Sequence, residues 1–404
     1  MSLENPPSIP GAEYAERRER ARIAAREAGL DGLLVWSMGG STLDSYGDVF
    51  YLANHFSVEP KAPDVPPYWT GFGHACVVLP VEGEPALLVG PPNWRRDLVE
   101  IEEVRANRDL FAETVQCLRD KGLAEGRVGI SREVLLPLPL YHQLRRDLPQ
   151  ATLVSADGIL ERLRVRKSPA EIEMMRHASA VAVEMMNALL SAAAVGRTDG
   201  DLAAVAFEVG TRYGATPYEF AFSSGPTSDN WYWPRLPGYD TRRPYEEGDL
   251  LHPDIFGCVN GYFYDFQRST VVGGRPSPGQ REALEAVVEL IHHICDQLRQ
   301  GTRACDAHGA GVQWLRETGW AEVMAGGDTD ASDFPAFGHG IGVGWEGPWI
   351  TAHDETVLEP GMTIAIEGAI QRPGVATAIF EQAVLVTEGA PEIMTAGCKS
   401  RWWD

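Results

Sequence analysis

An Asn-Gly pair flanked by two aspartates constrains the fold of this chain more than any other feature. Asn260 and Gly261 lie between two apolar, β-prone runs in the stretch LHPDIFGCVNGYFYDFQRST, which also contains Asp254 and Asp265. This pattern predicts a β-hairpin with a two-residue type I′ turn, because both central residues of that turn need positive φ.

The predicted turn sets the register of the hairpin. If Val259 pairs with Tyr262, Asp254 lies opposite Gln267, and Asp265 lies on the same face as Gln267. The two aspartates are then diagonal neighbours, roughly 5 to 8 Å apart. Carboxylates at that distance repel each other, which raises a pKa unless a cation lies between them. The hairpin therefore indicates a metal site, although a solvated face carrying two acids would show the same pattern.

Three further segments offer metal-binding side chains. His339 lies in the glycine-rich loop FGHGIG, Glu367 in the apolar strand IAIEGAI, and Glu381 in the apolar strand FEQAVLV. An unpaired buried carboxylate is strongly unfavourable, and metal coordination removes that cost. The full set suits two divalent ions with oxygen-rich coordination, from manganese, cobalt, iron or zinc. The predicted ligands are Asp254, Asp265, His339, Glu367 and Glu381.

The order and spacing of these segments resemble the pita-bread metallopeptidase family, which includes aminopeptidase P, prolidase, methionine aminopeptidase and creatinase. The matching segments are GDLLHPDIFGCVNGYFYDFQRS, GHGIG, LEPGM followed by IEG, and FEQAVLVTEGAPEIMT. RVRKSPAEIEMMRHA is similar to the family's domain junction. The resemblance implies an α/β (α+β) fold, with a creatinase-like α/β domain over residues 1–155 and a C-terminal pita-bread catalytic domain over residues 156–404.

The resemblance also implies roles for the predicted ligands. Glu367 would be both ligand and general base, and His339 and Glu381 would hold one ion. Asp254 would hold the other ion, with Asp265 and Glu381 as bridging ligands. A homodimer is implied as well.

The chain departs from the peptidases of this family at three substrate-binding positions. A histidine that usually follows the metal histidine is replaced by Trp345 or Glu346 in HGIGVGWEGPWI. A second histidine, expected after the SGP stretch, is absent from SSGPTSDNWYWPRLPG. An arginine that precedes the last metal glutamate in prolidase-like members is replaced by Ile379.

These departures predict an aromatic-walled pocket beside the metals. The predicted substrate-binding residues are Trp231, Tyr232, Trp233, Trp345 and Trp349, and Glu346 joins Glu367 as a catalytic candidate. Stacking a cation on tryptophan contributes about 0.5 to 2 kcal/mol per contact. Alternatively, the tryptophans fill a smaller pocket or form a dimer contact.

We therefore expect a dinuclear metalloenzyme that cleaves a C–N or related C–X bond of a small, cationic molecule, by hydrolysis or elimination. An Xaa-Pro dipeptidase or aminopeptidase, with a dipeptide substrate, is the second hypothesis. A metal-free binding scaffold of the same fold is the third.

Charge and composition exclude other classes. A formal net charge of −22 argues against nucleic acid and anionic membranes as partners. No apolar run long enough to span a membrane and no secretion signal is visible, so we expect a cytoplasmic protein. The six cysteines lack the spacing of a zinc ribbon or a disulfide framework.

Overall fold

The computed structural model describes residues 3–40, 45–60, 62–90, 94–228, 238–320, 337–372 and 374–404. The chain forms two compact units, Ile9–Arg164 and Val165–Asp404, with the residues before Ile9 assigned to the second unit. The boundary predicted between residues 155 and 156 lies just before helix α5 (Asp157–Val165), whereas the units divide at the end of that helix.

The first unit contains a mixed six-stranded sheet with the strand order β4-β3-β2-β1-β5-β6. The β1–β2 and β2–β3 pairs are antiparallel, and the other pairs are parallel. The strands are β1 (Gly32–Met38), β2 (His74–Pro80), β3 (Ala86–Val89), β4 (Glu103–Ala106), β5 (Arg127–Ser131) and β6 (Thr152–Ser155). The helices, besides α5, are α1 (Gly11–Glu27), α2 (Gly47–Ala53), α3 (Leu110–Asp120), the short 3-10 helix Glu133–Leu135, and α4 (Leu138–Asp147).

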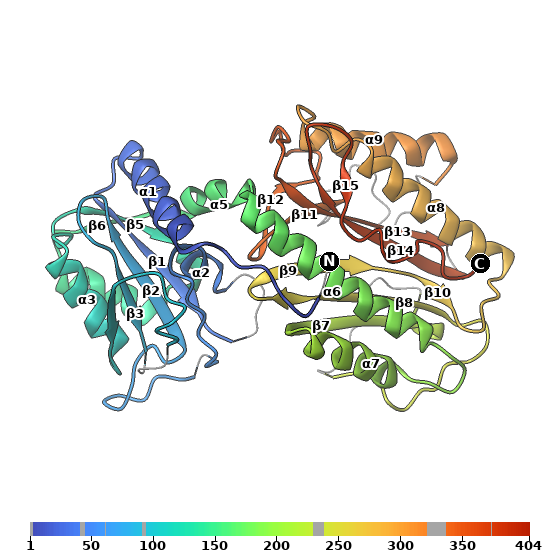
Figure 1. Cartoon of the computed structure of the whole chain (residues 1–404), viewed down its shortest axis with the longest axis horizontal. Helices are drawn as coiled ribbons and strands as arrows, with labels where there is room; N and C mark the ends of the chain where they lie inside the picture. Colours follow the sequence, from blue (N-terminus) through green and yellow to red (C-terminus); the bar gives the residue numbers. More distant parts are fainter. Residues whose placement is uncertain are drawn as a thin grey trace. The chain divides into compact units, whose positions relative to one another are not determined.

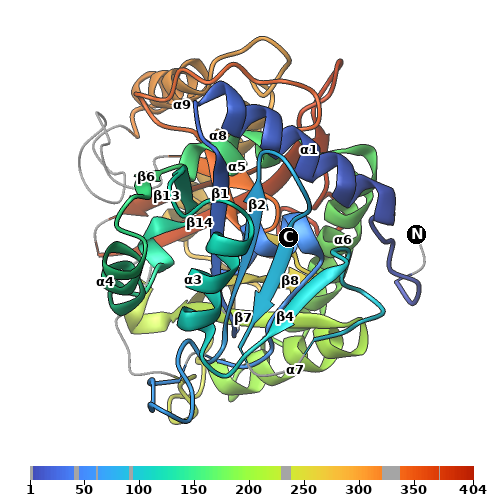
Figure 2. The ribbon, with the colours of Figure 1, turned by 90° about the vertical axis from the view of Figure 1, so that its left-hand side faces the viewer.

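Both faces of this sheet are buried. Leu33 and Val35 on β1 point into a core shared with α1, α2 and α5, whereas Leu34 and Trp36 point into a core shared with α3 and α4. This alternation follows from the two-residue period of a strand. Figure 2 shows α3 and α4 on the opposite side of the sheet from α1.

In its described residues, the second unit contains two sheets and two pairs of helices. One sheet has the order β10-β8-β7 with β9 paired to β8, and the other has the order β12-β11-β13-β14-β15. The strands of the first are β7 (Ala215–Ser224), β8 (Leu250–Val259), β9 (Tyr262–Gln267) and β10 (Thr270–Val271). Those of the second are β11 (Gly338–Ile341), β12 (Trp345–Trp349), β13 (Thr363–Arg372), β14 (Ala376–Leu385) and β15 (Glu392–Ile393).

Each sheet of this unit is covered by one helix pair. Helices α6 (Pro169–Ser191) and α7 (Asp199–Arg212) pack on β7, β8 and β9, while α8 (Pro278–Cys295) packs on β13 and β14, with α9 (Ala304–Thr318) beside it. A 3-10 helix, Gly225–Thr227, follows β7. In Figure 1, α8 and α9 lie above the two sheets and α7 lies below them. The sheets therefore face each other between the helix layers, and β9 contacts β13 and β14.

The structure confirms the predicted hairpin. Asn260 and Gly261 have φ values of 48° and 82°, as a type I′ turn requires. Strands β8 and β9 pair with Val259 opposite Tyr262 and Asp254 opposite Gln267, which is the predicted register.

A capping box fixes the start of α6. The Ser168 side chain accepts a hydrogen bond from the Glu171 backbone, and the Glu171 carboxylate accepts one from the Ser168 backbone. These bonds satisfy donors that the first helical turn leaves open. Among the described helices, none is long and apolar enough to cross a membrane.

Candidate metal centre

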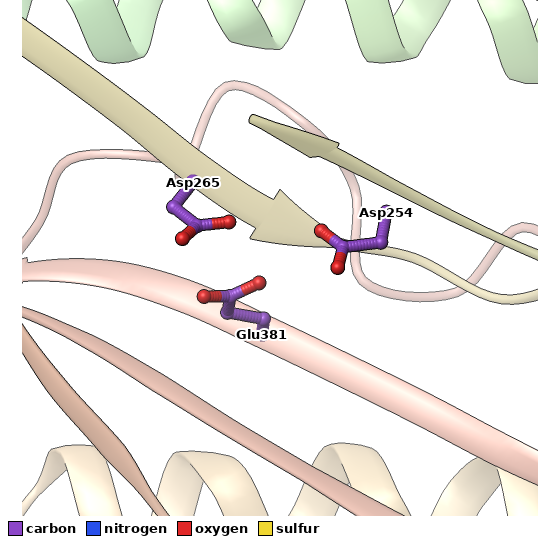
Figure 3. Close-up of side chains that lie close together, drawn as sticks. All are labelled: Asp254, Asp265 and Glu381. Carbon is purple, nitrogen blue, oxygen red and sulfur yellow. The ribbon is translucent and has the colours of Figure 1, made fainter. Parts of the chain in front are cut away.

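Three buried carboxylates converge between the two sheets of the second unit. Asp254 on β8, Asp265 on β9 and Glu381 on β14 each offer an oxygen, and these atoms all lie within 4.8 Å of one another. Figure 3 shows the three side chains pointing toward a common space. Each residue is at most 4% exposed. The pleat aims both aspartates at one face of the hairpin, and the facing sheet adds the glutamate.

His339 and Glu367 complete a second group of donors. His339 on β11 places Nε2 at 3.7 Å from both Asp265 Oδ2 and Glu367 Oε1. Glu367 on β13 lies directly opposite Glu381 on β14. The five predicted ligands therefore form two groups that share Asp265, one including Asp254 and the other including His339.

The orientation of His339 suits a metal ligand. Its Nδ1 lies 3.1 Å from the backbone oxygen of Gly340. Because a carbonyl only accepts hydrogen bonds, Nδ1 carries the hydrogen, and Nε2 turns a lone pair toward the carboxylates. Burial lowers the pKa of His339 to about 4, so the imidazole is neutral near pH 7.

Gln267 connects the carboxylates of the two sheets. Its side-chain amide donates to Asp254 Oδ2 and to Glu367 Oε2, both at 3.1 Å. The sequence placed Gln267 opposite Asp254 but did not identify it as a site residue. Its position on the same face of the hairpin as Asp265 was the feature of the sequence that could have identified it as a site residue.

The carboxylates strongly disfavour ionisation when no cation lies between them. Burial, followed by the neighbouring charges of Asp254 and Glu367, raises the pKa of Asp265 well above its ordinary range. Burial and the charges of Asp265, Glu367 and Asp254 do the same to Glu381. Burial and Asp254 raise the pKa of Glu367 to about 8, against the opposing hydrogen bond from Gln267.

These donors fit a divalent cation. Within the part of the chain that the structure describes, both carboxylate oxygens of Glu381 are buried and lack a hydrogen-bond partner. A buried carboxylate in this state is costly unless it is protonated or coordinated. Carboxylate oxygens and an imidazole nitrogen are ligands that manganese, iron, cobalt and zinc accept.

Trp345 and Trp349 pack beside these ligands. The Trp345 indole Nε1 donates to Asp265 Oδ2 at 3.0 Å, and its ring centroid is 4.6 Å from that of His339. The centroid of Trp349 is 5.7 Å from that of His339. Both tryptophans are partly exposed. The structure therefore brings them to the cluster, and substrate binding by them stays a prediction.

Glu346 has a partner that sequence analysis did not find. It forms an ion pair with Lys167, and both side chains are 1% exposed. The two residues are 179 positions apart, and no local pattern connects them. This contact gives Glu346 a structural role, and its catalytic role stays a prediction. The predicted residues Trp231, Tyr232 and Trp233 lie outside the described residues.

Arg268 is a second residue that sequence analysis missed. Its side chain is fully buried and donates to backbone oxygens of Gln267 and Glu381. It also donates to the side chain of Gln382 and to the backbone oxygens of Cys398 and Lys399. Arg268 thus ties the backbones of β9, β14 and the C-terminal segment together beside the carboxylates.

Comparison with known families agrees with this architecture. Residues 173–388 match the model of metallopeptidase family M24, and residues 17–166 match the model of the creatinase/prolidase N-terminal domain. The order of the two matches confirms the predicted fold class.

The individual relatives have low sequence identity to this chain, and their names give different activities. An Xaa-Pro dipeptidase from Pyrococcus furiosus is 28% identical over 59% of this chain and 65% of its own length. An ectoine hydrolase from Halomonas elongata is 26% identical over 81% of this chain and 86% of its own length. The crystal structure of dipeptidase PepE from Mycobacterium ulcerans superposes with a TM-score of 0.74 at 26% identity, covering 96% of each chain.

Proposed function

Because the chain belongs to metallopeptidase family M24, we propose that it is a dinuclear metal-dependent hydrolase that cleaves a C–N or related C–X bond of a small, cationic molecule. The proposal includes two divalent ions, a homodimer, and catalysis within residues 156–404.

The convergence of five donor side chains carries this proposal. Asp254, Asp265 and Glu381 meet within 4.8 Å, and His339 Nε2 lies 3.7 Å from Asp265 and from Glu367. Four acids and one neutral imidazole balance two dications in charge. A buried cluster of four acids without cations would instead need protons on most of its members.

The surrounding residues orient these donors. The Gln267 amide holds one oxygen of Asp254 and one of Glu367, and the Gly340 carbonyl fixes the ring of His339. Such outer hydrogen bonds set ligand geometry before an ion arrives. Asp254 and Asp265 would hold ions together with Glu381, and His339 would hold the ion next to Glu367.

The chemistry that follows is hydrolysis. Divalent ions bound here would supply Lewis acidity and lower the pKa of a water molecule toward neutrality. Glu367 is the candidate general base, because it is a carboxylate that lies beside His339 and opposite Glu381 in the cluster. With Oε2 held by Gln267, Glu367 can accept a proton on a carboxylate whose orientation is already fixed.

The substrate class rests on the residues beside the donors. Trp345 and Trp349 line the His339 side of the cluster. Ile379 stands where prolidase-like members are expected to carry an arginine. An aromatic and apolar wall favours a cationic group over a carboxylate. Similarity to an ectoine hydrolase over most of its length is consistent with a non-peptide substrate.

Metal analysis tests the dinuclear site. We expect protein stripped with a chelator and reloaded with manganese to retain two equivalents per chain by elemental analysis. The variant Glu381→Gln should retain one or none. Glu388→Gln, which changes an exposed acid in the same unit, should retain two. A wild-type protein that stays empty after reloading would defeat the proposal and favour a metal-free scaffold.

Substrate assays separate the two enzymatic hypotheses. An Xaa-Pro dipeptidase is the second candidate, because relatives with that activity match this chain. The reloaded protein should turn over amidine, guanidino or quaternary ammonium compounds faster than Ala-Pro or Gly-Pro. Efficient manganese- or cobalt-dependent cleavage of these dipeptides would reverse the ranking.

A further inference from the structure

Two side chains from β11 and β12 approach the same oxygen of Asp265. The Trp345 indole nitrogen lies 3.0 Å from Asp265 Oδ2, and His339 Nε2 lies 3.7 Å from it. The first contact is a hydrogen bond, because the indole N–H only donates. The second is too long for a hydrogen bond and leaves room for a shared cation between oxygen and nitrogen.

Trp345 also packs against His339. The two ring centroids are 4.6 Å apart with an interplanar angle of 39°. Asp265 belongs to the hairpin sheet and His339 to the facing sheet, so the indole contacts one candidate ligand from each. A single side chain thus fixes the separation of two donors across the sheet interface.

The segment that carries Trp345 is firmly held. The next residue, Glu346, forms the fully buried ion pair with Lys167. The backbone of Phe263 on β9 donates to the Gly342 carbonyl at 2.8 Å, which ties the β11–β12 turn to the hairpin. A Cβ atom on Gly340 would lie 2.1 Å from the Gly347 oxygen, so β11 and β12 are packed too closely for a side chain there.

We propose that Trp345 is a positioning residue that directs Asp265 Oδ2 toward His339 and thereby retains the ion held on the His339 side of the cluster. The inference rests on the proposed function, since it requires ions in the carboxylate cluster. Trp345 would then orient a metal ligand, in addition to the substrate contact predicted from the sequence.

The physical reason lies in the freedom of a carboxylate. Asp265 can offer its oxygens to both donor groups only while one oxygen stays turned toward His339. The indole N–H favours that orientation, and it does so before any ion is bound. Without the donor, Asp265 can rotate toward Asp254 and serve that side alone. Loss of such an outer hydrogen bond typically weakens metal binding about 10- to 100-fold.

The test uses Trp345→Phe, which keeps an aromatic ring and removes the indole donor. Manganese binding is measured by calorimetry, and the exchange coupling between neighbouring manganese ions by electron paramagnetic resonance. The matched control is Trp403→Phe, because Trp403 is 3% exposed and its Nε1 has no partner among the described residues. We expect the control to bind two coupled ions. Trp345→Phe should keep one ion at wild-type affinity and bind the second about 10- to 100-fold more weakly.

Three results distinguish this inference from the proposed function. Two ions of wild-type affinity in Trp345→Phe would overturn the inference and leave the proposed function intact. Equal weakening of both ions would reveal a merely structural effect and would also overturn it. A wild-type protein that binds no ion would overturn the proposed function, and the inference with it.

A measurement on the wild-type protein does not depend on the folding of any variant. The indole N–H resonances of nitrogen-15-labelled protein are followed during zinc addition. At least one resonance should shift as zinc fills the cluster, because the acceptor of the Trp345 donor changes its charge environment. If zinc binds and every indole resonance stays in place, the inference is wrong.

Discussion

The metal-free protein should lose stability as the pH rises above about 7.5. Burial raises the pKa of Glu367 to about 8, whereas an unfolded glutamate titrates near 4.3. Between these values the folded state binds a proton that the unfolded state has released. Stability contributed by this proton is fully present below the unfolded pKa and is lost as the pH rises through the folded pKa.

Buried histidines titrate in the lower part of this pH range and change the stability in the opposite direction. Burial lowers the pKa values of His55, His252 and His339 to about 4, whereas unfolded histidine titrates near 6.5. Over that interval the folded state binds fewer protons than the unfolded state, so these residues increase stability as the pH rises. Unfolded histidine is still half protonated at pH 6.5, so this contribution levels off only near pH 7.5. Above about pH 7.5, groups with raised pKa values such as Glu367 determine the slope.

The expected magnitude follows from the proton difference. One proton held only by the folded state gives a slope of about 1.4 kcal/mol per pH unit. For Glu367 alone the free energy of unfolding falls by about 0.7 kcal/mol between pH 7.5 and 8.5, since this interval is centred on its folded pKa. Asp265 and Glu381 have raised pKa values as well and steepen the decline.

Urea unfolding of chelator-treated protein, followed by circular dichroism at several pH values, measures this slope. Glu367→Gln should make it shallower, and the exposed-site control Glu388→Gln should leave it unchanged. Saturating manganese should abolish the decline, because ions replace the protons of the cluster. A metal-free wild type whose unfolding free energy stays constant or increases from pH 7.5 to 8.5 would refute the reasoning.

Two further predictions concern the segment around Trp345. Lys167→Met leaves Glu346 charged, buried and without its cation, so the free energy of unfolding in urea should fall by about 3 to 5 kcal/mol. As a control, Arg166→Met removes only an exposed ion pair and should lower the free energy of unfolding by less than about 1 kcal/mol. A similar loss in both variants would contradict the burial of the Lys167–Glu346 pair. Gly340→Ala should lower the melting temperature and weaken manganese binding, because its Cβ would lie 2.1 Å from the Gly347 oxygen. Gly347→Ala meets nothing within 4 Å and should behave as wild type, and equal behaviour of the two variants would refute the packing argument.

The hairpin could be predicted in detail because its information is local. Asn260 and Gly261 determine the turn, the turn determines the register, and the strand period then places Asp254 and Asp265 on one face. The cap of α6 was predictable for the same reason, since Ser168 and its partners lie within one helical turn.

Contacts between distant segments could not be predicted in this way. Lys167 and Glu346 are both ordinary charged residues in the sequence, and only the fold brings β12 and the residue before the α6 cap together. The hydrogen bond from Trp345 to Asp265 likewise depends on how two sheets approach each other. Strand patterns predict which face a side chain occupies, but they do not determine its partner on another sheet. The ion pair of Glu346 with Lys167 therefore could not be read from the sequence, and the catalytic role of Glu346 stays a prediction.

Protons and divalent ions are alternative ways to neutralise the negative charge of the buried carboxylates. Two buried cations of this unit, among the described residues, are already engaged: Arg268 donates to four backbone oxygens and one side-chain oxygen, and Lys167 pairs with Glu346. The excess negative charge of the buried carboxylates must then be removed by protonation or balanced by added cations. Each ion that enters displaces protons, so metal affinity must increase with pH over the same range in which the metal-free fold becomes less stable. The expected instability of the metal-free protein at high pH and the proposed affinity of the cluster for divalent ions thus have a single cause, which is the burial of Asp254, Asp265, Glu367 and Glu381 in one place.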